Sequence, residues 1–247
     1  MESYDYSQLA EHYDELELDY EHDEFNKILS KILKKFKVKT VLDVACGTGL
    51  QAIYLNSKNF KVTASDYNPE MIKIAQKKTK NLKFLQGDMK TINYGKFDAV
   101  ISIYNVIGHL TKKEFEEALI NISNSLKDNG LYIFDINNLE YLKNNLPDYE
   151  YIDVADRVNG IKYVRFNKDK LDRKGAVLYT THKTYVQKNM EKPKVYNEKC
   201  RLQIYSAEQL KEILNKTGFE IINLLNINGK SFNSQTDLNI VAIARKK

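Results

Sequence analysis

The sequence is poor in cysteine: its 247 residues include only Cys46 and Cys200. Two cysteines are too few for a disulfide framework, and the histidines and cysteines form no cluster with the spacing of a zinc site. No run of about 18 apolar residues occurs, such as a membrane-spanning helix needs. The first residues also lack the charged and then apolar pattern of a signal peptide. We therefore expect a cytoplasmic protein with no metal and no membrane segment.

A strong excess of charge of one sign is missing as well. There are 38 Lys+Arg against 33 Asp+Glu, a formal net charge of +5. The basic residues are spread along predicted helices and interleaved with acids, and short basic runs such as 34–37 and 245–247 are usually solvated faces. We therefore do not expect nucleic-acid binding. Hydrophobic residues make up 43%, which is enough for one large α/β domain, or for a core domain that carries an insertion.

Apolar residues recur at helical spacing from Ser7 to about Phe36, which predicts two N-terminal helices. Strands and helices then alternate. Strands are expected at Thr40–Val44, Lys61–Ser65, Lys83–Leu85, Ala99–Ile103 and Leu131–Asp135, and helices at Leu50–Asn56, Pro69–Lys78 and Lys112–Leu126. Strands separated by helices pair in parallel through right-handed crossovers, with helices on both faces of the sheet. The core is therefore predicted to be a doubly wound α/β sheet.

The pattern changes between about Leu139 and Cys200, where short alternating segments show no convincing helix. Strands are expected there at Tyr149–Asp153, Ile161–Phe166 and Ala176–Tyr185, with hairpin-like turns at 158–160 and 172–175. We interpret residues 139–200 as a small antiparallel β insertion that forms a lid on the core. The core then comprises residues 1–138 and 201–247.

The chain closes with an expected helix at Ser206–Thr217 and two strands at Glu220–Asn226 and Asn239–Arg245. The segment 227–238 between these strands is rich in Asn, Ser and Gly and gives no sign of the crossover helix that parallel pairing requires. The two strands should therefore form an antiparallel hairpin at the edge of the sheet. With this hairpin the predicted sheet has seven strands, most of them parallel.

The first core strand runs directly into Gly47, Thr48 and Gly49, and a helix follows. Glycines have no Cβ, so backbone at this turn can pass close to a ligand. Gly47, Gly49 and Ala52 also satisfy the dinucleotide-binding pattern G-x-G-x-x-G/A. The turn by itself therefore leaves an oxidoreductase open.

Two acids follow at the ends of the next two strands. Asp66 lies 19 residues after Gly47, where a carboxylate can accept hydrogen bonds from both ribose hydroxyls. Asp88, just beyond the third strand, is placed to read an adenine amino group while Met89 packs on the ring. The ends of these three strands therefore predict an adenosine-containing ligand.

These blocks resemble class I S-adenosylmethionine-dependent methyltransferases. The similarity lies in residues 41–49 (VLDVACGTG), 64–71 (ASDYNPEM) and 86–89 (QGDM), and it covers about Tyr6 to Gly130 and again Arg201 to the end. It implies a methyltransferase with a Rossmann-like core. Such an enzyme uses S-adenosyl-L-methionine as its cofactor and transfers the methyl group to a small-molecule acceptor.

The resemblance also implies which residues hold the cofactor. Asp43 would organise the glycine turn and the cofactor's amino group, Asp66 would hold the ribose, and Asp88 would read the adenine edge. The full set comprises Tyr6, Tyr13, Asp43, Ala45, Gly47, Thr48, Gly49, Asp66, Tyr67, Met71, Asp88, Met89, Ile103 and His109. Ordinary structural interpretations stay open, since Asp66 precedes the helix-start signal at 68–69 and buried methionines often only fill a core.

Residues 103–110 resemble the segment that follows the same strand in glycine N-methyltransferases, which suggests Asn105 at the acceptor and His109 as a catalytic residue beside the cofactor. Those enzymes hold a substrate carboxylate with an Arg just after the fifth strand, where this chain has residues 135–138 (DINN). We therefore expect a neutral or cationic amine or hydroxyl metabolite as acceptor, and a monomer or homodimer. An RNA or protein methyltransferase and a non-catalytic S-adenosylmethionine-binding module stay open as alternatives.

Overall fold

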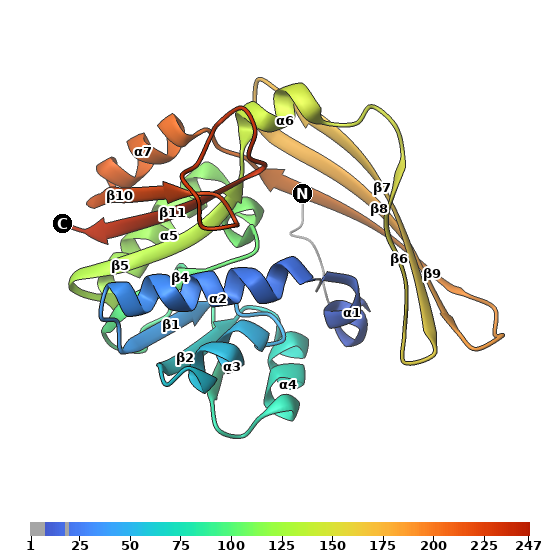
Figure 1. The fold of residues 1–247 in the computed structure, drawn as a ribbon, viewed down its shortest axis with the longest axis horizontal. Coiled ribbons are helices and arrows are strands. Elements are labelled where there is room, and N and C mark those ends of the chain that lie inside the picture. The colour runs from blue at the N-terminus through green and yellow to red at the C-terminus, as the bar shows by residue number, and fades with distance from the viewer. Residues whose placement is uncertain (1–7, 18–19) are drawn as a thin grey trace.

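The computed structural model describes residues 8–17 and 20–247, and these form two β-sheets (Figure 1). The larger sheet has seven strands in the order β10-β11-β5-β4-β1-β2-β3. Its strands are β1 (Thr40–Val44), β2 (Lys61–Asp66), β3 (Lys83–Gln86), β4 (Phe97–Ser102), β5 (Leu126–Asn137), β10 (Phe219–Leu225) and β11 (Asn239–Lys246). The first five pair in parallel, whereas β11 runs antiparallel to both β5 and β10. The predicted sheet with its antiparallel C-terminal hairpin is confirmed.

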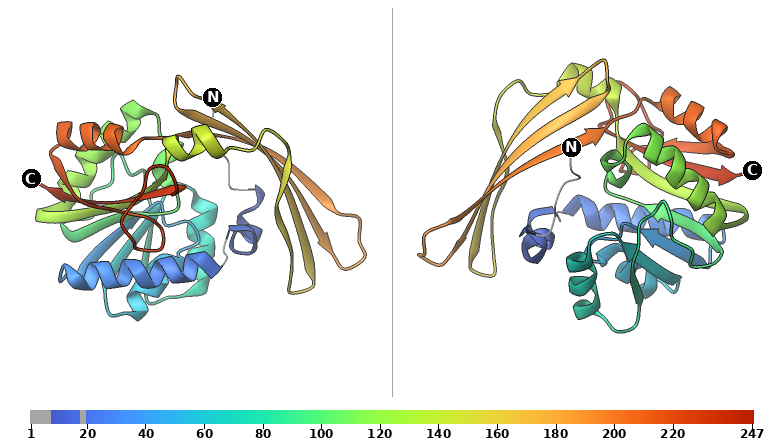
Figure 2. Two further views of the ribbon diagram at one scale, coloured as in Figure 1. Left: turned by 45° about the horizontal axis from the view of Figure 1, so that its top comes forward. Right: turned by 180° about the vertical axis from the view of Figure 1, so that it is seen from behind.

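Helices cover both faces of the seven-stranded sheet (Figure 2). One face packs against α2 (Tyr20–Lys35), α3 (Leu50–Ser57) and α4 (Pro69–Lys78), and the other against α5 (Lys112–Ser125) and α7 (Ala207–Lys216). Successive side chains of a strand point to opposite faces. Val41 of β1 therefore packs with the apolar side chains of α2, α3 and α4, and Leu42 with those of α5 and α7. Two cores on one sheet are the arrangement expected of a doubly wound fold.

Two helix starts in the core are fixed by reciprocal capping boxes. The Thr111 hydroxyl accepts a hydrogen bond from the Glu114 N–H, and the Glu114 carboxylate accepts one from the Thr111 N–H. Ser206 and Gln209 form the same arrangement at the start of α7. These local hydrogen bonds satisfy N–H groups that a helix leaves unpaired at its start, so the sequence determines these boundaries closely.

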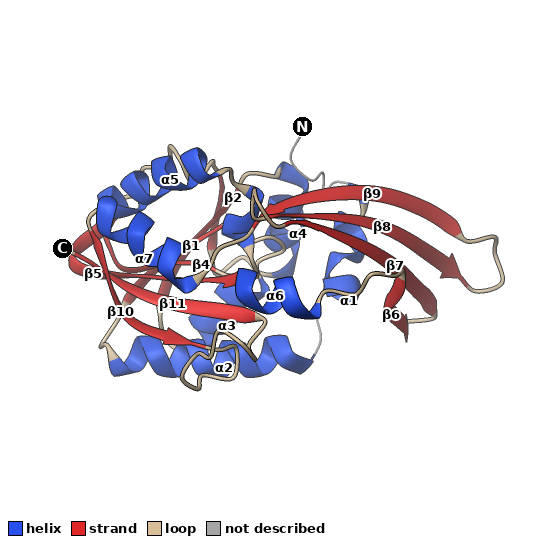
Figure 3. Cartoon of the chain, turned by 90° about the horizontal axis from the view of Figure 1, so that it is seen from above, coloured by secondary structure: helices blue, strands red, loops and turns tan. Residues whose placement is uncertain are grey.

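The smaller sheet is an all-antiparallel meander of β6 (Tyr151–Val158), β7 (Ile161–Asp172), β8 (Val177–Lys188) and β9 (Lys194–Gln203). It confirms the predicted antiparallel insertion, and it extends to one side of the core (Figure 3). The expectation that this segment holds no helix was wrong, because it begins with α6 (Leu139–Asn145). The Asn138 side chain caps this short helix, and its apolar side chains pack on Ala176, Leu178 and Ile204 near the base of the smaller sheet.

One face of the smaller sheet packs against the N-terminal segment formed by η2 (Ala10–His12) and α1 (Tyr13–Glu17). Tyr163 and Val186 contact Leu9 and Leu16 in a small apolar cluster. We call this the inner face of the smaller sheet, and the opposite side its outer face. No helix in the described part of the chain is long and apolar enough to cross a membrane.

Candidate active site

The glycine turn follows β1 and reaches α3 through backbone of positive φ. Ala45, Gly47 and Gly49 have φ values of 59°, 54° and 81°. A Cβ on Gly49 would lie 2.6 Å from the Phe84 ring, so this glycine allows the turn to pack against β3. A Cβ on Gly47 would meet only the Tyr13 ring, at 3.8 Å, within a 4 Å radius. The Gly47 side of the turn therefore faces α1.

Asp43, at the base of this turn, is buried with one unsatisfied carboxylate oxygen. Its side chain is 1% exposed, and Oδ2 has no hydrogen-bond partner among the described residues. Burial, with the nearby charge of Asp66, raises the pKa of Asp43 well above its usual value. Buried polar atoms normally have partners, so an unpaired one beside a close-approach turn fits a ligand that supplies a donor. The amino group of the expected cofactor is such a donor.

Asp66 ends β2 beside the same turn. Its Oδ2 accepts a hydrogen bond from the Gly47 N–H at 2.8 Å, and its Oδ1 accepts one from the Asn68 N–H at 2.8 Å. Burial raises the pKa of Asp66, while both backbone hydrogen bonds act to lower it. Each carboxylate oxygen can accept a second hydrogen bond, so both oxygens can still accept from ribose hydroxyls. The structural and the ligand interpretation of Asp66 are therefore compatible.

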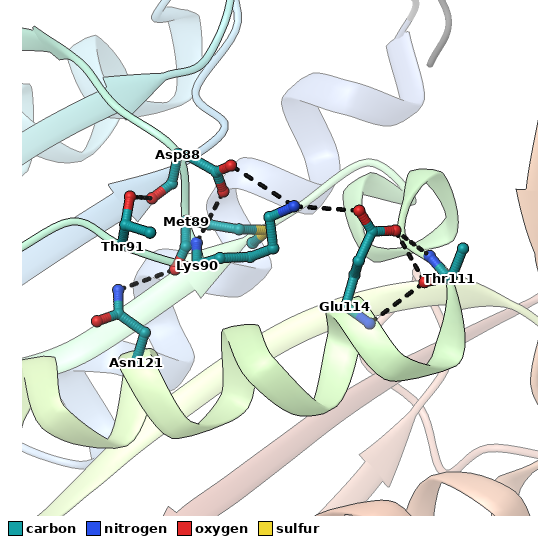
Figure 4. A network of polar contacts seen from close by, with 7 residues as sticks. All are labelled: Asp88, Met89, Lys90, Thr91, Thr111, Glu114 and Asn121. Atoms are coloured by element: carbon teal, nitrogen blue, oxygen red, sulfur yellow. Dashed lines mark hydrogen bonds and ion pairs between the residues drawn. The ribbon is translucent and has the colours of Figure 1, made fainter. Parts of the chain in front are cut away.

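The residues predicted to hold the adenine differ in exposure. Tyr67 is 70% exposed directly after β2, whereas Met71 on α4 is buried. Asp88 and the buried Met89 belong to a loop that is tied to α5 (Figure 4). Lys90 links the Asp88 carboxylate, at 3.6 Å, to that of Glu114, at 3.1 Å. This link holds the loop in place and leaves Asp88 partly exposed.

The N-terminal segment is bound to the glycine turn through Asp14 of α1. Its carboxylate accepts a hydrogen bond from the hydroxyl of the buried Thr48 and forms an ion pair with Lys78 of α4. Tyr13 lies at Gly47, as described above, and burial followed by the charge of Glu17 raises its pKa. The structure therefore brings Tyr13 of α1 to the glycine turn that contains Thr48, and their contact with the cofactor stays a prediction. Tyr6, the other predicted tyrosine of the N-terminal segment, lies outside the described residues.

Two solved structures share this architecture over nearly the whole chain. An S-adenosylmethionine-dependent methyltransferase from Clostridium acetobutylicum superposes with a TM-score of 0.81 at 20% identity, covering 98% of both chains. An amino pentose methyltransferase from Micromonospora echinaspora, with S-adenosylmethionine bound, gives a TM-score of 0.77 at 19% identity over 97% of both chains. At these identities the likeness is one of fold.

The sequence comparisons give the class. Residues 41–130 match the family described as Methyltransferase domain. A putative methyltransferase of Bacillus subtilis is 28% identical over 222 residues, covering 87% of both chains. These matches support an S-adenosylmethionine-dependent methyltransferase. The matching block contains the glycine turn, Asp66 and Asp88, so the class and the cofactor predicted from these residues are confirmed.

A glycine/sarcosine N-methyltransferase of Parasynechococcus marenigrum is 36% identical over 120 residues. The match covers 45% of this methyltransferase and 43% of that enzyme, so the chain spans less than half the length of that relative. The expected resemblance to glycine N-methyltransferases therefore concerns only part of the chain.

The segment after β4 in this methyltransferase is held by a buried acid that the sequence analysis did not single out. Asp135 of β5 is 3% exposed and accepts hydrogen bonds from the N–H groups of Tyr104 and Asn105, both of which have positive φ. Burial raises the pKa of Asp135 to about 6, while these backbone hydrogen bonds act to lower it. The signal that could have identified Asp135 is an acid near the end of a buried strand, a position that Asp43 also has in β1.

Asn105, the predicted acceptor residue, has a contact of its own with β5. Its Oδ1 accepts a hydrogen bond from the Asn137 N–H at 3.1 Å, and its carboxamide lies against Gly108. The buried Ile103 lies between β4 and this segment. The Asn105 carboxamide therefore bridges the two strand ends at which an acceptor is expected.

His109 ends η3 (Val106–His109), a short helix that packs against β9 of the smaller sheet. Burial lowers the pKa of His109 from 6.5 to about 4, so the ring is neutral at pH 7. A neutral imidazole can accept a hydrogen bond, but a pKa of about 4 makes it a weak base, so the catalytic role of His109 stays a prediction.

The buried His109 should make the stability of the methyltransferase depend on pH. Its pKa is lower folded than unfolded, so the unfolded chain binds the proton first as the pH falls, and stability is lost between pH 6.5 and 4. We expect up to about 2 kcal/mol of this loss by pH 5. Urea unfolding of His109→Gln should therefore show a flatter pH dependence between pH 7 and 5. Parallel curves for the variant and the parent would refute the assignment.

Proposed function

We propose that the methyltransferase acts on a small amine that carries positive charge when protonated, bound between the inner face of the smaller sheet and the segment after β4. The observation that carries this proposal is the acidic character of the inner face. Asp153, Asp169 and Glu198 belong to it, and Glu17 of α1 lies against it. Its cations are Arg165, which pairs with two of these acids, and Lys188 and Lys194 at the far end of the sheet. Such a surface attracts a cation and repels a carboxylate.

Asp169 is the member best suited to bind a ligand. Its Oδ2 accepts a hydrogen bond from the Tyr151 hydroxyl at 2.7 Å, and its Oδ1 is buried without a hydrogen-bond partner among the described residues. An ammonium group would satisfy this oxygen with a charge-assisted hydrogen bond. Arg165 does not neutralise Asp169, because its guanidinium pairs with Glu17 and Asp153.

The carboxylates of the inner face gather around Cys200 of β9. Burial, followed by the charges of Glu17, Glu198 and Asp169, raises the pKa of the Cys200 thiol to about 12. Because β9 packs against η3, this acidic region lies on the same side of the chain as His109. The arrangement supports an acceptor site between the two sheets.

The end of β5 offers no cation for an acceptor carboxylate within the described part of the chain. Asp135 stands there and holds the segment after β4. The Asn138 side chain caps α6 and donates to the carbonyl oxygens of Ser234 and Asp237. This supports a cationic acceptor over a glycine-like one. The likeness in fold to an amino pentose methyltransferase supports an amine on a small molecule.

The cofactor supplies an activated methyl group on sulfur, so the chain needs no covalent nucleophile. Its residues have to align the acceptor nitrogen with the methyl group and exclude water. An ammonium group bound by Asp169 must lose a proton before its lone pair can attack. That proton passes to water, and His109, which is neutral at pH 7, can accept a hydrogen bond from the acceptor nitrogen.

Asp169→Asn should raise KM for an amine acceptor about tenfold or more and change kcat much less, since the residue binds the charged group of the acceptor. Steady-state kinetics with a responsive amine measures this. The matched control is Asp128→Asn, an exposed acid at the far end of β5. An unchanged KM in Asp169→Asn, with normal cofactor binding, would rule out the proposed acceptor site while leaving the enzyme class intact.

A further inference from the structure

The outer face of the smaller sheet is strongly basic. Directly paired residues in an antiparallel sheet point to the same side, so the pairing of β6 to β9 sorts every side chain between the two faces. The face opposite Tyr163 carries Arg157, Lys162, Lys168, Lys170, Lys183, Lys199 and Arg201. All are exposed except Arg201, which is partly buried. The strands place one acid on this face, Asp172, which is the last residue of β7. Its carboxylate accepts hydrogen bonds from the N–H groups of Lys174 and Gly175 in the following turn.

Strand alternation produces this segregation from a sequence that looks mixed. In β7 the run Lys168-Asp169-Lys170 interleaves opposite charges. Asp169 points to the inner face, where it meets Tyr151, and the two lysines point outward. Charges that are neighbours in the sequence therefore lie on opposite faces of the sheet.

Aromatic rings lie among these cations. Tyr179 is 38% exposed and sits directly between Lys170 of β7 and Arg201 of β9. Further along the face, the Phe166 and Tyr185 rings meet edge to face with centroids 6.0 Å apart. Rings on an exposed sheet, flanked by basic side chains, are the means by which many proteins stack the bases of a single strand.

The cations of the outer face are mostly without acidic neighbours among the described residues; the exception is Lys183, whose pKa is raised by Tyr185 and also by the charge of Glu150. None of the seven forms an ion pair with a described carboxylate, although lysines elsewhere in the chain do. Lys168 and Lys199 flank Thr181 from the two neighbouring strands, about 9.5 Å apart by the spacing of strands. Cations held this close repel one another, and a bound polyanion would relieve that repulsion.

We propose that the outer face of the smaller sheet binds single-stranded nucleic acid, against the expectation from the sequence, in which the basic residues are interleaved with acids. Phosphates would lie along the rows of lysine on β7 and β9, and a base would stack on Tyr179. An anionic membrane would satisfy the cations but gives no reason for rings placed between them. The outer face points away from α1, Tyr163 and Arg165, so the nucleic acid is a ligand held apart from methyl transfer. The proposal does not rest on the identity of the methyl acceptor.

The test is a fluorescence anisotropy titration of the full chain with labelled single-stranded RNA and DNA of about 12 nucleotides, at several salt concentrations. The triple variant Lys168→Glu/Lys170→Glu/Lys199→Glu should lose at least about 30-fold in affinity. Its log–log salt slope should fall in magnitude by about 2, because each phosphate contact on a single strand contributes about 0.7. Tyr179→Ala should weaken binding about tenfold with an unchanged salt slope, because stacking is not ionic.

The matched control is Lys77→Glu/Lys80→Glu/Lys83→Glu, which changes the net charge equally at exposed positions around α4 and β3. It should bind nearly as the parent does. If both triple variants lost affinity for the oligonucleotides equally, the net charge alone would explain the binding, and the proposal would be overturned. So would absence of binding near 100 mM salt, or binding to vesicles of anionic phospholipid in place of the oligonucleotides. Self-association through this face, detected by sedimentation and abolished by the outer-face variant, would likewise overturn it.

Discussion

Replacement of Asp66 by alanine should weaken S-adenosylmethionine binding by about 10- to 150-fold, or about 1.5–3 kcal/mol. The carboxylate is buried at the end of β2 and already orients the Gly47 and Asn68 amides. The variant removes the proposed acceptors for the ribose hydroxyls and also two bonds that shape the turn. Isothermal titration calorimetry measures the loss.

Two further variants separate the contribution of the ribose contact from that of the turn. Asp66→Asn keeps one side-chain oxygen as an acceptor and should bind more tightly than Asp66→Ala. Glu70→Ala removes a partly exposed acid in the first turn of α4 and should leave the affinity unchanged. Thermal melts confirm that each variant is folded. If the alanine variant binds the cofactor as tightly as the parent, the assignment of Asp66 to the ribose is wrong.

Replacement of Arg165 by alanine should lower the free energy of unfolding by about 3–5 kcal/mol. The side chain is buried, its Nε lies 2.6 Å from Asp153 Oδ2, and it also pairs with Glu17 of α1. Removing the guanidinium leaves two carboxylates close together without their cation. Urea denaturation should show the loss, and Arg157→Ala, an exposed change on the same sheet, should cost less than about 0.5 kcal/mol.

The Arg165 variant also tests how the smaller sheet supports the cofactor site. Glu17 belongs to the helix whose Tyr13 lies at Gly47, so loosening α1 should also weaken cofactor binding. If the Arg165 and Arg157 variants have the same free energy of unfolding, the packing of α1 on the smaller sheet does not depend on this ion pair.

The core could be predicted from the sequence because its signals are local. Asn68 ahead of Pro69 starts α4 where expected, since the Asn68 side chain accepts the Glu70 N–H. The capping boxes of α5 and α7 act in the same way within four residues. The C-terminal hairpin followed from a missing crossover helix, which is a constraint on connections that needs no distant contact.

Features that depend on distant contacts could not be predicted. The hydrogen bond between Thr48 and Asp14 joins residues 34 positions apart, and the support of Asn105 by Asp135 joins residues 30 apart. Helix α6 is short, and its apolar side chains pack on residues that follow it by about 35 positions or more. The separation of charge on the smaller sheet required the register of each strand, which the alternation of residues alone does not give.

The central claim is that this methyltransferase acts on a small amine, and a transfer assay with methyl-labelled S-adenosylmethionine tests it most directly. The assay offers pools of small amines that include amino sugars, together with peptides and total RNA, and mass spectrometry identifies the product. We predict label in a small amine that has gained one methyl group, with reduced transfer by Asn105→Ala and with RNA and peptides unlabelled. Label confined to RNA or peptides, or no transfer to any pool by protein that binds the cofactor, would contradict the account.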